Sequence, residues 1–312
     1  MHGRHAIIDL GTNTFHLLVI EKSENSYQIL HKEKKAVRIG EDGITNRIIN
    51  ASALARAVDA AKSFKCISEE YNVSNFHVTA TSAVRDASNG NLFTKEIQKA
   101  TGFDIKVITG DKEAELIYYG VRSALKLGDS SSLIMDIGGG SVEFIIGNST
   151  KILWKQSIPI GAQRLIEKFH HNDPINTEEI AEIENYLKSN LNPLIAKLEE
   201  IGPKTLIGAS GSFDTLSDIY KLKFKIRDKV TSGEVPFDLD CFYGIYHEIL
   251  SKDREQRLDI PGMIEMRVDM IVVACILINF VLKNYHFNDI RVSSYALKEG
   301  ILFCLLNGVS YY

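Results

Sequence analysis

The stretch "IMDIGGGSVEFII", residues 134–146, decides the fold of this 312-residue chain. An apolar run ends at Asp136, three glycines and a serine follow, and a second apolar run begins at Val142. Glycine loops that bind phosphate usually lie between a strand and a helix. Here the second run reads as a strand, so we predict a hairpin whose turn carries the glycines and whose second strand carries Glu143.

The same pattern occurs near the start of the chain. "DLGTNTFHLLV", residues 9–19, aligns without a gap with "DIGGGSVEFII", residues 136–146. In each copy a strand-like run ends at an aspartate, Asp9 or Asp136, and a glycine-containing turn leads into a second strand-like run. Because internal repeats reveal architecture, we predict two α/β halves of one plan, the second beginning at about residue 130.

The periodicity of the apolar residues supports this plan in both halves. We expect strands at residues 5–10, 15–21, 27–39, 76–81, 104–109, 132–137, 141–147, 151–160, 204–209 and 289–295. We expect helices at residues 47–71, 91–101, 111–127, 163–171 and 178–201, from residue 212, within 237–285 and at 296–308. Each half therefore opens with three strands, which helices and further strands follow.

The composition narrows the class of protein. The chain is 45% hydrophobic and 24% charged, with a net charge of −4 and a pI near 6.2, which argues against a broad nucleic-acid-binding surface. Its four cysteines are far apart, and no secretory signal is visible. The most apolar segment, residues 270–282, is too short to span a membrane. We expect a cytoplasmic protein with neither nucleic-acid nor membrane partners.

The glycine turn is a candidate phosphate site. Without side chains, Gly138, Gly139 and Gly140 let backbone N–H groups approach an anion and can adopt positive φ. Ser141 adds a hydroxyl group. A tight hairpin that merely needs glycine is the alternative. The preceding aspartate and the matching loop in the first half favour phosphate binding.

The carboxylates beside the turn suggest a metal. Asp136 and Glu143 are seven positions apart across the turn, so both side chains can point to one end of the sheet. Mg²⁺, with Mn²⁺ as a substitute, commonly takes one or two carboxylates together with phosphate oxygens and water. Asp9 is the equivalent carboxylate of the first half. Glu143 is otherwise either an exposed strand residue or a buried charge that needs a partner.

The first-half loop offers further phosphate ligands. Thr12 and Asn13 present hydroxyl, amide and backbone donors, although an Asx-type turn that stabilises the hairpin explains them too. His16 occupies the position that matches Glu143, and its apolar surroundings favour a core or cleft-edge histidine over a ligand.

Two such halves, each with an Asp-Gly hairpin facing a cleft, resemble the actin-like (ribonuclease H-like) ATPase fold of sugar kinases, Hsp70 and actin. Within that fold the sequence looks like the exopolyphosphatase / guanosine pentaphosphate phosphohydrolase (Ppx/GppA) family. The resemblance rests on segments that follow the family's order over most of the chain: "IIDLGTNTFHLLV", "TSAVRDA", "VITGDKEAELIYYGV", "IMDIGGGSVEFII", "GASGSFDTL" and "MRVDMIVVACILI".

The resemblance implies roles for residues that are ambiguous by themselves. Glu113 could be an acidic residue favoured by a helix dipole, but it matches the family's glutamate that orients or deprotonates the attacking water. Arg85, otherwise a surface charge, matches a phosphate-contacting arginine. Arg267 matches an arginine that opens a long helix near the second phosphate loop. Ser210 lies in a small-residue turn that lines the cleft in the family.

The resemblance also implies domains and a reaction. We expect an N-terminal actin-like domain at 1–128 and a second at 129–296, with the helix at about 297–312 able to pack back on the first. The implied activity is metal-assisted release of terminal orthophosphate from inorganic polyphosphate, with guanosine pentaphosphate as the alternative substrate. The family also suggests a homodimer.

Three further expectations remain open at this point. Longer family members carry an added C-terminal helical region, and this sequence, which ends at Tyr312, has no evident basic track for a long polyanion. We therefore expect a preference for short chains or a nucleotide. The rival functions are an actin-like small-molecule kinase and a non-enzymatic phosphate or nucleotide sensor.

Overall fold

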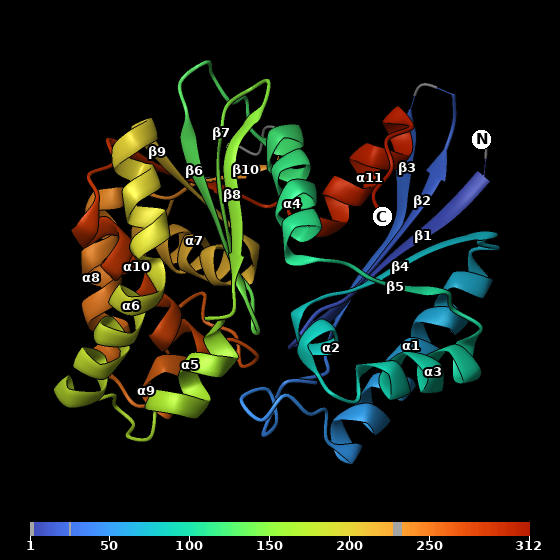
Figure 1. Ribbon diagram of the computed structural model, residues 1–312, viewed down its shortest axis with the longest axis horizontal. Helices are drawn as coiled ribbons and strands as arrows, with labels where there is room; N and C mark the ends of the chain where they lie inside the picture. Colours follow the sequence, from blue (N-terminus) through green and yellow to red (C-terminus); the bar gives the residue numbers. More distant parts are fainter. Residues whose placement is uncertain (1–2, 25, 227–232) are drawn as a thin grey trace.

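The computed structural model describes residues 3–24, 26–226 and 233–312, and in these residues the strands form two separate sheets (Figure 1). The first sheet has the order β3-β2-β1-β4-β5. Its strands are β1 (Gly3–Leu10), β2 (Thr14–Lys22), β3 (Tyr27–Ala36), β4 (Asn75–Ala80) and β5 (Ile105–Val107). We call this sheet, with the helices α1 to α3 that cover it, the first lobe.

The second sheet repeats the first. Its order, β10-β11-β9-β6-β7-β8, contains the same arrangement of five strands with β10 added at one edge. Its strands are β6 (Ser132–Ile137), β7 (Val142–Gly147), β8 (Ile152–Ile158), β9 (Thr205–Ala209), β10 (Glu234–Val235) and β11 (Asp289–Ser293). We call this sheet, with helices α5 to α10, the second lobe. In each sheet the opening hairpin is antiparallel and its first strand pairs in parallel with the next strand after a helix.

The two hairpins agree residue by residue. Asp9 lies opposite His16 in the pairing of β1 with β2, and Asp136 lies opposite Glu143 in the pairing of β6 with β7. A Cβ atom on Gly138 would lie 2.9 Å from the carbonyl oxygen three residues later, and the equivalent distance at Gly11 is 2.8 Å. The predicted repeat and the predicted meeting of Asp136 with Glu143 are therefore confirmed.

The helices follow the predicted plan with small changes at their ends. They are α1 (Ala51–Glu70), α2 (Ser82–Asp86), α3 (Gly90–Thr101), α4 (Gly110–Ala124), α5 (Ala162–Phe169), α6 (Thr177–Ile201), α7 (Ser210–Phe224), α8 (Leu239–Ser251), α9 (Arg254–Leu258), α10 (Met270–Asn284) and α11 (Leu297–Asn307). None of these helices, all within the described residues, is long and apolar enough to cross a membrane.

The differences from the predicted elements have local causes. Helix α1 begins four residues later than predicted because the Asn50 side chain accepts the N–H of Ala53 and caps the helix there. Strand β3 ends at Ala36 because the N–H groups of Val37 and Arg38 both turn to the carbonyl of Asn13. The short α2 and β10 were not predicted, since neither is long enough to show a period.

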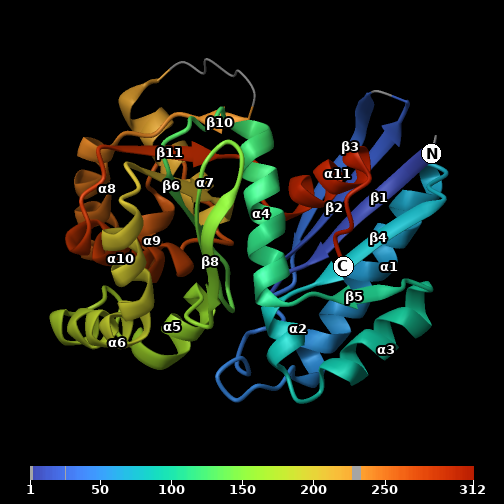
Figure 2. The same cartoon turned by 45° about the horizontal axis from the view of Figure 1, so that its top comes forward.

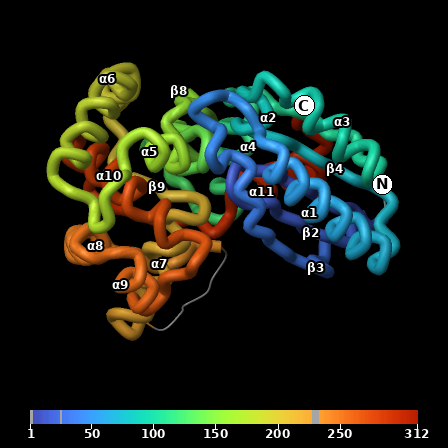
Figure 3. The backbone as a smooth tube through the Cα atoms, turned by 90° about the horizontal axis from the view of Figure 1, so that it is seen from below, coloured from blue at the N-terminus to red at the C-terminus, as the bar shows by residue number. Residues whose placement is uncertain are grey.

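Helices α4 and α11 lie between the two sheets (Figure 2 and Figure 3). Each lobe has its own apolar core, and a third core joins α4 and α11 to buried residues of both sheets, such as Ile7 of β1 and Ile145 of β7. Helix α4 packs on β7 and β8, whereas α11 packs on α4 and β1. The proposed domain boundary at about residue 128 therefore falls just after a helix that covers the second sheet.

Two glycines allow α4 and α11 to approach closely. A Cβ atom on Gly300 of α11 would overlap the carbonyl oxygen of Leu116, and one on Gly120 of α4 would overlap that of Ala296. Neither contact can be relieved by a side-chain rotation, because backbone atoms meet on both sides.

We predict that Gly300→Ala lowers the free energy of unfolding by about 1–3 kcal/mol, since overpacking must separate the two helices. Gly244→Ala is the matched control: Gly244 is also in a helix, α8, but a Cβ atom there would meet nothing within 4 Å. Its helix propensity favours a gain of up to about 1 kcal/mol. Urea unfolding measures both variants, and equal effects would contradict the close approach.

Candidate active site

The two hairpin turns meet at a cavity of about 440 Å³ between the lobes, within the size range of small-molecule sites. Twelve of the thirteen residues predicted for the site line it: Asp9, Thr12, Asn13, Glu113, Asp136, Gly138, Gly139, Gly140, Ser141, Glu143, Ser210 and Arg267. The thirteenth, Arg85, reaches the wall of the cavity through its contact with Glu113.

The glycine turn touches the first lobe directly. A Cβ atom on Gly139 would lie 3.0 Å from Thr12 and from Asn13, and one on Gly140 would lie 2.6 Å from the Ser82 hydroxyl oxygen. The expected use of positive φ is wrong, because the φ of Gly138, Gly139 and Gly140 lies outside the left-handed region. The missing side chains serve instead to let the two lobes come together.

Helix α5 fixes the orientation of this turn. The backbone N–H groups of Ala162 and Gln163 donate to the carbonyls of Gly138 and Gly139, each at 2.9 Å. The Gly140 carbonyl accepts from the Arg164 side chain at 2.7 Å. All three glycine carbonyls therefore have donors from α5, which suits a turn whose N–H groups serve an anion.

Hydroxyl groups hold two of the carboxylates. Glu143 is 1% exposed, and its Oε1 accepts from the hydroxyls of Ser141 and Ser157, each at 2.6 Å. Asp136 accepts from the hydroxyl of Ser210 at 2.7 Å. Ser210 has a φ of 68°, a conformation that non-glycine residues adopt mainly where the surrounding structure imposes it. Ser210, which was predicted to lie at the site, therefore donates to a carboxylate there.

Asp9 differs from Asp136 and Glu143 in its hydrogen bonding. Its Oδ1 is buried and, among the described residues, has no hydrogen-bond partner. Burial raises its pKa to about 8, and the nearby charges of Glu113 and Asp136 raise that pKa as well. A buried carboxylate that repels its neighbours is stabilised by a proton or by a cation.

Glu113, Asp136 and Glu143, three further carboxylates of the cavity, also have raised pKa values. Burial raises the pKa of Glu113 to about 7, opposed by the charge of Arg85, and raises the pKa of Asp136 to about 6, opposed by the hydroxyl of Ser210. Burial, followed by repulsion from Glu113, holds the pKa of Glu143 well above its usual value. The cavity therefore concentrates negative charge away from water.

The predicted metal ligands fit a divalent cation only together with a substrate. Within the described ranges, no group of three or more His, Cys, Asp or Glu side chains is arranged as a metal site. Asp9, Asp136 and Glu143 thus form no complete cage. Mg²⁺ needs only one or two carboxylates when phosphate oxygens and water supply the rest. The orphaned oxygen of Asp9 and the repulsion among the carboxylates suit such a partly protein-bound ion.

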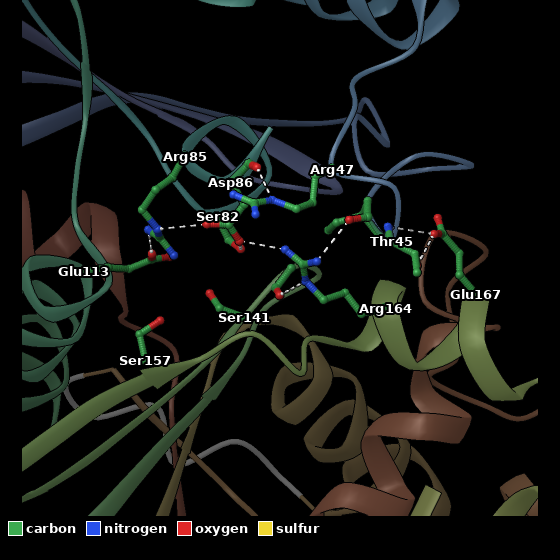
Figure 4. A network of polar contacts seen from close by, with 12 residues as sticks. Thr45, Arg47, Ser82, Arg85, Asp86, Glu113, Ser141, Ser157, Arg164 and Glu167 are labelled. Atoms are coloured by element: carbon green, nitrogen blue, oxygen red, sulfur yellow. Dashed lines mark hydrogen bonds and ion pairs between the residues drawn. The ribbon is translucent and has the colours of Figure 1, made fainter. Parts of the chain in front are cut away.

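Glu113 has the setting of a general base. It lies in the first turn of α4, and it is 7% exposed at the cavity wall. Its Oε2 accepts from Arg85 at 2.8 Å (Figure 4). The same nitrogen of Arg85 also donates to the carbonyl of Ile108 at 3.1 Å. The arginine therefore fixes the glutamate at one oxygen.

Several cavity residues were missed by the sequence analysis. Lys298, in the first turn of α11, lines the cavity and pairs with Glu299 at 3.0 Å. Lys34 also lines it. The two lysines come from distant segments that the fold brings together. Arg267, which was predicted, lies so close to Gly211 that a Cβ atom there would overlap its guanidinium group.

Among the described residues, carboxylates outnumber cations in the cavity lining. The seven carboxylates are Asp9, Glu33, Glu113, Asp136, Glu143, Asp214 and Asp218. The four cationic side chains of the same part of the chain are Lys32, Lys34, Arg267 and Lys298. His16 adds no charge near neutral pH, because burial and the neighbouring cations, Lys298 first, lower its pKa to about 3. It lies at the edge of the cavity, as predicted.

The raised pKa of Asp9 predicts a pH-dependent stability. An aspartate with a pKa of about 8 when folded and 3.8 when unfolded costs stability progressively as the pH rises from about 4 to 8. In EDTA, the stability of Asp9→Asn relative to the wild type should therefore increase across this pH window, by at most about 1.4 kcal/mol per pH unit. Urea unfolding at several pH values measures the difference, and a constant difference contradicts the assignment. Asp111→Asn, which removes an exposed carboxylate outside the cavity, is the control.

Comparison with known proteins agrees with this geometry. The Ppx/GppA phosphatase family model matches residues 18–308. A crystal structure of an exopolyphosphatase from Cytophaga hutchinsonii has 43% sequence identity and a TM-score of 0.95 over 99% of both chains. The Aquifex aeolicus PPX-GPPA enzyme has 22% identity and a TM-score of 0.76 over 97% of this chain and 99% of its own, which shows the fold alone.

Sequence relatives lead to the same family. A Haemophilus influenzae protein named as a candidate exopolyphosphatase is 26% identical over 96% of this chain and 90% of its own length. A guanosine-5'-triphosphate,3'-diphosphate pyrophosphatase from Pseudoalteromonas atlantica is 26% identical over 98% of this chain, which spans 59% of the relative. The predicted two-domain actin-like ATPase fold is confirmed by the structural likeness, and the chain belongs to the Ppx/GppA phosphatase family.

Proposed function

We propose that this phosphatase cleaves the terminal phosphoanhydride bond of short inorganic polyphosphate, and that Mg²⁺ assists the attack of water. The observation that carries the proposal is the excess of carboxylates over cations, among the described residues, in the cavity that joins the two hairpin turns. A polyanion enters such a cavity only with a cation that offsets both its own charge and that of the protein.

Asp136, Glu143 and Asp9 would hold this cation, with Mn²⁺ as a substitute. When bound, the ion neutralises the charge that develops on the phosphate oxygens. Hydroxyl groups donate to Asp136 and to Glu143. Oδ1 of Asp9 has no hydrogen-bond partner in the part of the chain that the structure describes, so it could bind the cation.

The chain's own groups can bind and orient the phosphates. The Gly138–Ser141 turn and the loop that carries Thr12 and Asn13 line one cavity from opposite lobes. The N–H of Gly138 already donates to the carbonyl of Ser141 at 3.0 Å, so the donors proposed for phosphate are those of the following residues of the turn and of Thr12. Arg267 adds a cation at the second turn. Phosphoryl transfer requires mainly positioning and charge stabilisation, so two donor loops around one phosphate chain match its needs.

Glu113 would accept the proton of the attacking water. Its raised pKa, about 7, favours proton uptake near neutral pH, whereas Arg85 holds the carboxylate in place through one oxygen. The other oxygen of Glu113 would accept the proton from water. In this proposal Glu113 activates the water, and the other polar residues of the cavity bind the substrate and its cation.

We predict that Glu113→Gln lowers kcat by at least about 10²-fold and changes KM by less than about threefold, because the amide cannot accept the proton. Glu115→Gln is the matched control. Glu115 lies two residues further along α4 and pairs with Lys155 at 3.1 Å, outside the cavity lining. Orthophosphate release with Mg²⁺ measures both. A control as damaged as Glu113→Gln would refute the role of Glu113, as would an unchanged kcat of Glu113→Gln.

Guanosine pentaphosphate is the second candidate substrate. Beyond the phosphate turns, the cavity continues to Asp214, Thr215 and Asp218 on α7, where carboxylates suit sugar hydroxyls or ring amines better than further phosphates. The relatives named as guanosine-5'-triphosphate,3'-diphosphate pyrophosphatases support this option.

We predict faster orthophosphate release from tripolyphosphate than from polyphosphate of about a thousand units at equal phosphate concentration, since the described residues put more carboxylates than cations along the cavity that a long polyanion would follow. Guanosine pentaphosphate, measured under the same conditions, shows how the nucleotide compares with the two polyphosphates as a substrate. Faster release from the long polymer would contradict the short-chain proposal. Release that continues without any divalent cation would contradict the metal-dependent mechanism.

A further inference from the structure

The second lobe contacts the first through a buried arginine of α5. Arg164 is 8% exposed, and its guanidinium donates to three acceptors (Figure 4). Nε donates to the carbonyl of Gly140 at 2.7 Å, one terminal nitrogen donates to the carbonyl of Ile44 at 3.0 Å, and the other donates to Asp86 Oδ2 at 2.7 Å. One side chain therefore binds the glycine turn of its own lobe and two segments of the other lobe.

Asp86 passes this contact on to Arg85. Its Oδ2 accepts from Arg164 and from the hydroxyl of Ser82 at 3.1 Å, while its Oδ1 lies 3.7 Å from Arg85 Nε. Arg85 in turn donates to Glu113 at 2.8 Å. The continuous path from Gly140 through Arg164, Asp86 and Arg85 thus ends at the carboxylate assigned to water activation.

The path exists only while the two lobes are in contact. Ser82, whose hydroxyl donates to Asp86, also lies against the glycine turn, since a Cβ atom on Gly140 would lie 2.6 Å from that hydroxyl oxygen. If the lobes separated, Arg164 would lose Asp86 and Ile44 together, and Asp86 would be left to compete with Glu113 for Arg85. A planar guanidinium with several donors in fixed directions can hold all three acceptors at once, which a lysine ammonium cannot do in the same geometry.

We propose that Arg164 is a positioning residue, which aligns Glu113 for catalysis only when the glycine turn is seated against the first lobe. It acts through Asp86 and Arg85 and does not touch the reacting atoms. The inference deepens the proposed function, because it rests on the role of Glu113 as the group that activates water.

The test is a double-mutant cycle on orthophosphate release from tripolyphosphate, or from guanosine pentaphosphate if that is cleaved faster. We expect Arg164→Gln to lower kcat by about 10²-fold, the scale of a misplacement of about 1 Å, and to change KM by less than about threefold. In a Glu113→Gln background the same substitution should cost less than about threefold, since the group that it positions is already absent. Equal losses in both backgrounds would overturn the proposal.

Two further variants separate positioning from simple loss of a lobe contact. Glu167→Ala removes another contact between the lobes, in which Thr45 donates to Glu167 through its N–H at 3.2 Å and its hydroxyl at 2.7 Å, with no link to Glu113. We expect its kcat to stay within about twofold of the wild type. Arg164→Lys keeps the charge and guards against misfolding of the glutamine variant. Its kcat should fall by at least about tenfold, and a wild-type kcat would overturn the need for the three-way contact.

The cycle also separates failure of this inference from failure of the proposed function. A fully active Glu113→Gln enzyme would show that Glu113 is not the base. Arg164 would then have no base to position, and both proposals would fail. An inactive Glu113→Gln enzyme together with a fully active Arg164→Gln enzyme would leave the proposed function intact and refute the positioning role alone.

Discussion

The structure depends on one electrostatic constraint: carboxylates from both lobes are buried together where the lobes meet. Asp9, Glu113 and Asp136 all have raised pKa values, and desolvation is the first cause in each case. Burying such a cluster lowers the stability of the fold. A cation that binds together with an anionic substrate would offset this cost. The surrounding hydroxyls, glycine turns and arginines would help to hold that cation and that substrate.

The duplicated hairpin explains how the fold builds this cluster. In both sheets the first strand of the hairpin ends at an aspartate, and its turn needs a glycine for the same close carbonyl contact. Two copies placed face to face bring two donor loops and two carboxylates to one cavity. The copies differ where the chemistry must differ, since His16 of the first hairpin stands where Glu143 stands in the second, and it stays neutral near pH 7.

Local sequence patterns predicted the sheets and most helices, because hairpins, glycine turns and helix caps act over short distances. Together with the family resemblance they indicated thirteen site residues, of which twelve line the cavity. The long-range features could not be predicted in this way. Lys298 reaches the cavity only because Gly300 and Gly120 let α11 lie against α4. The joint role of Arg164 and Asp86 depends on how two lobes dock, which no single segment determines. The use of the glycines for lobe contact, instead of positive φ, is a further example.

The most direct measurement is the affinity of the protein for Mn²⁺, with and without a non-hydrolysable triphosphate. Electron paramagnetic resonance detects the bound ion. Because Asp9, Asp136 and Glu143 form no complete cage, the account predicts weak binding to the protein alone. Affinity should rise at least about tenfold with the triphosphate, and Asp136→Asn should abolish that gain. Tight binding without any phosphate, or a gain that survives in Asp136→Asn, would contradict the claim that the buried carboxylates and the substrate share the metal.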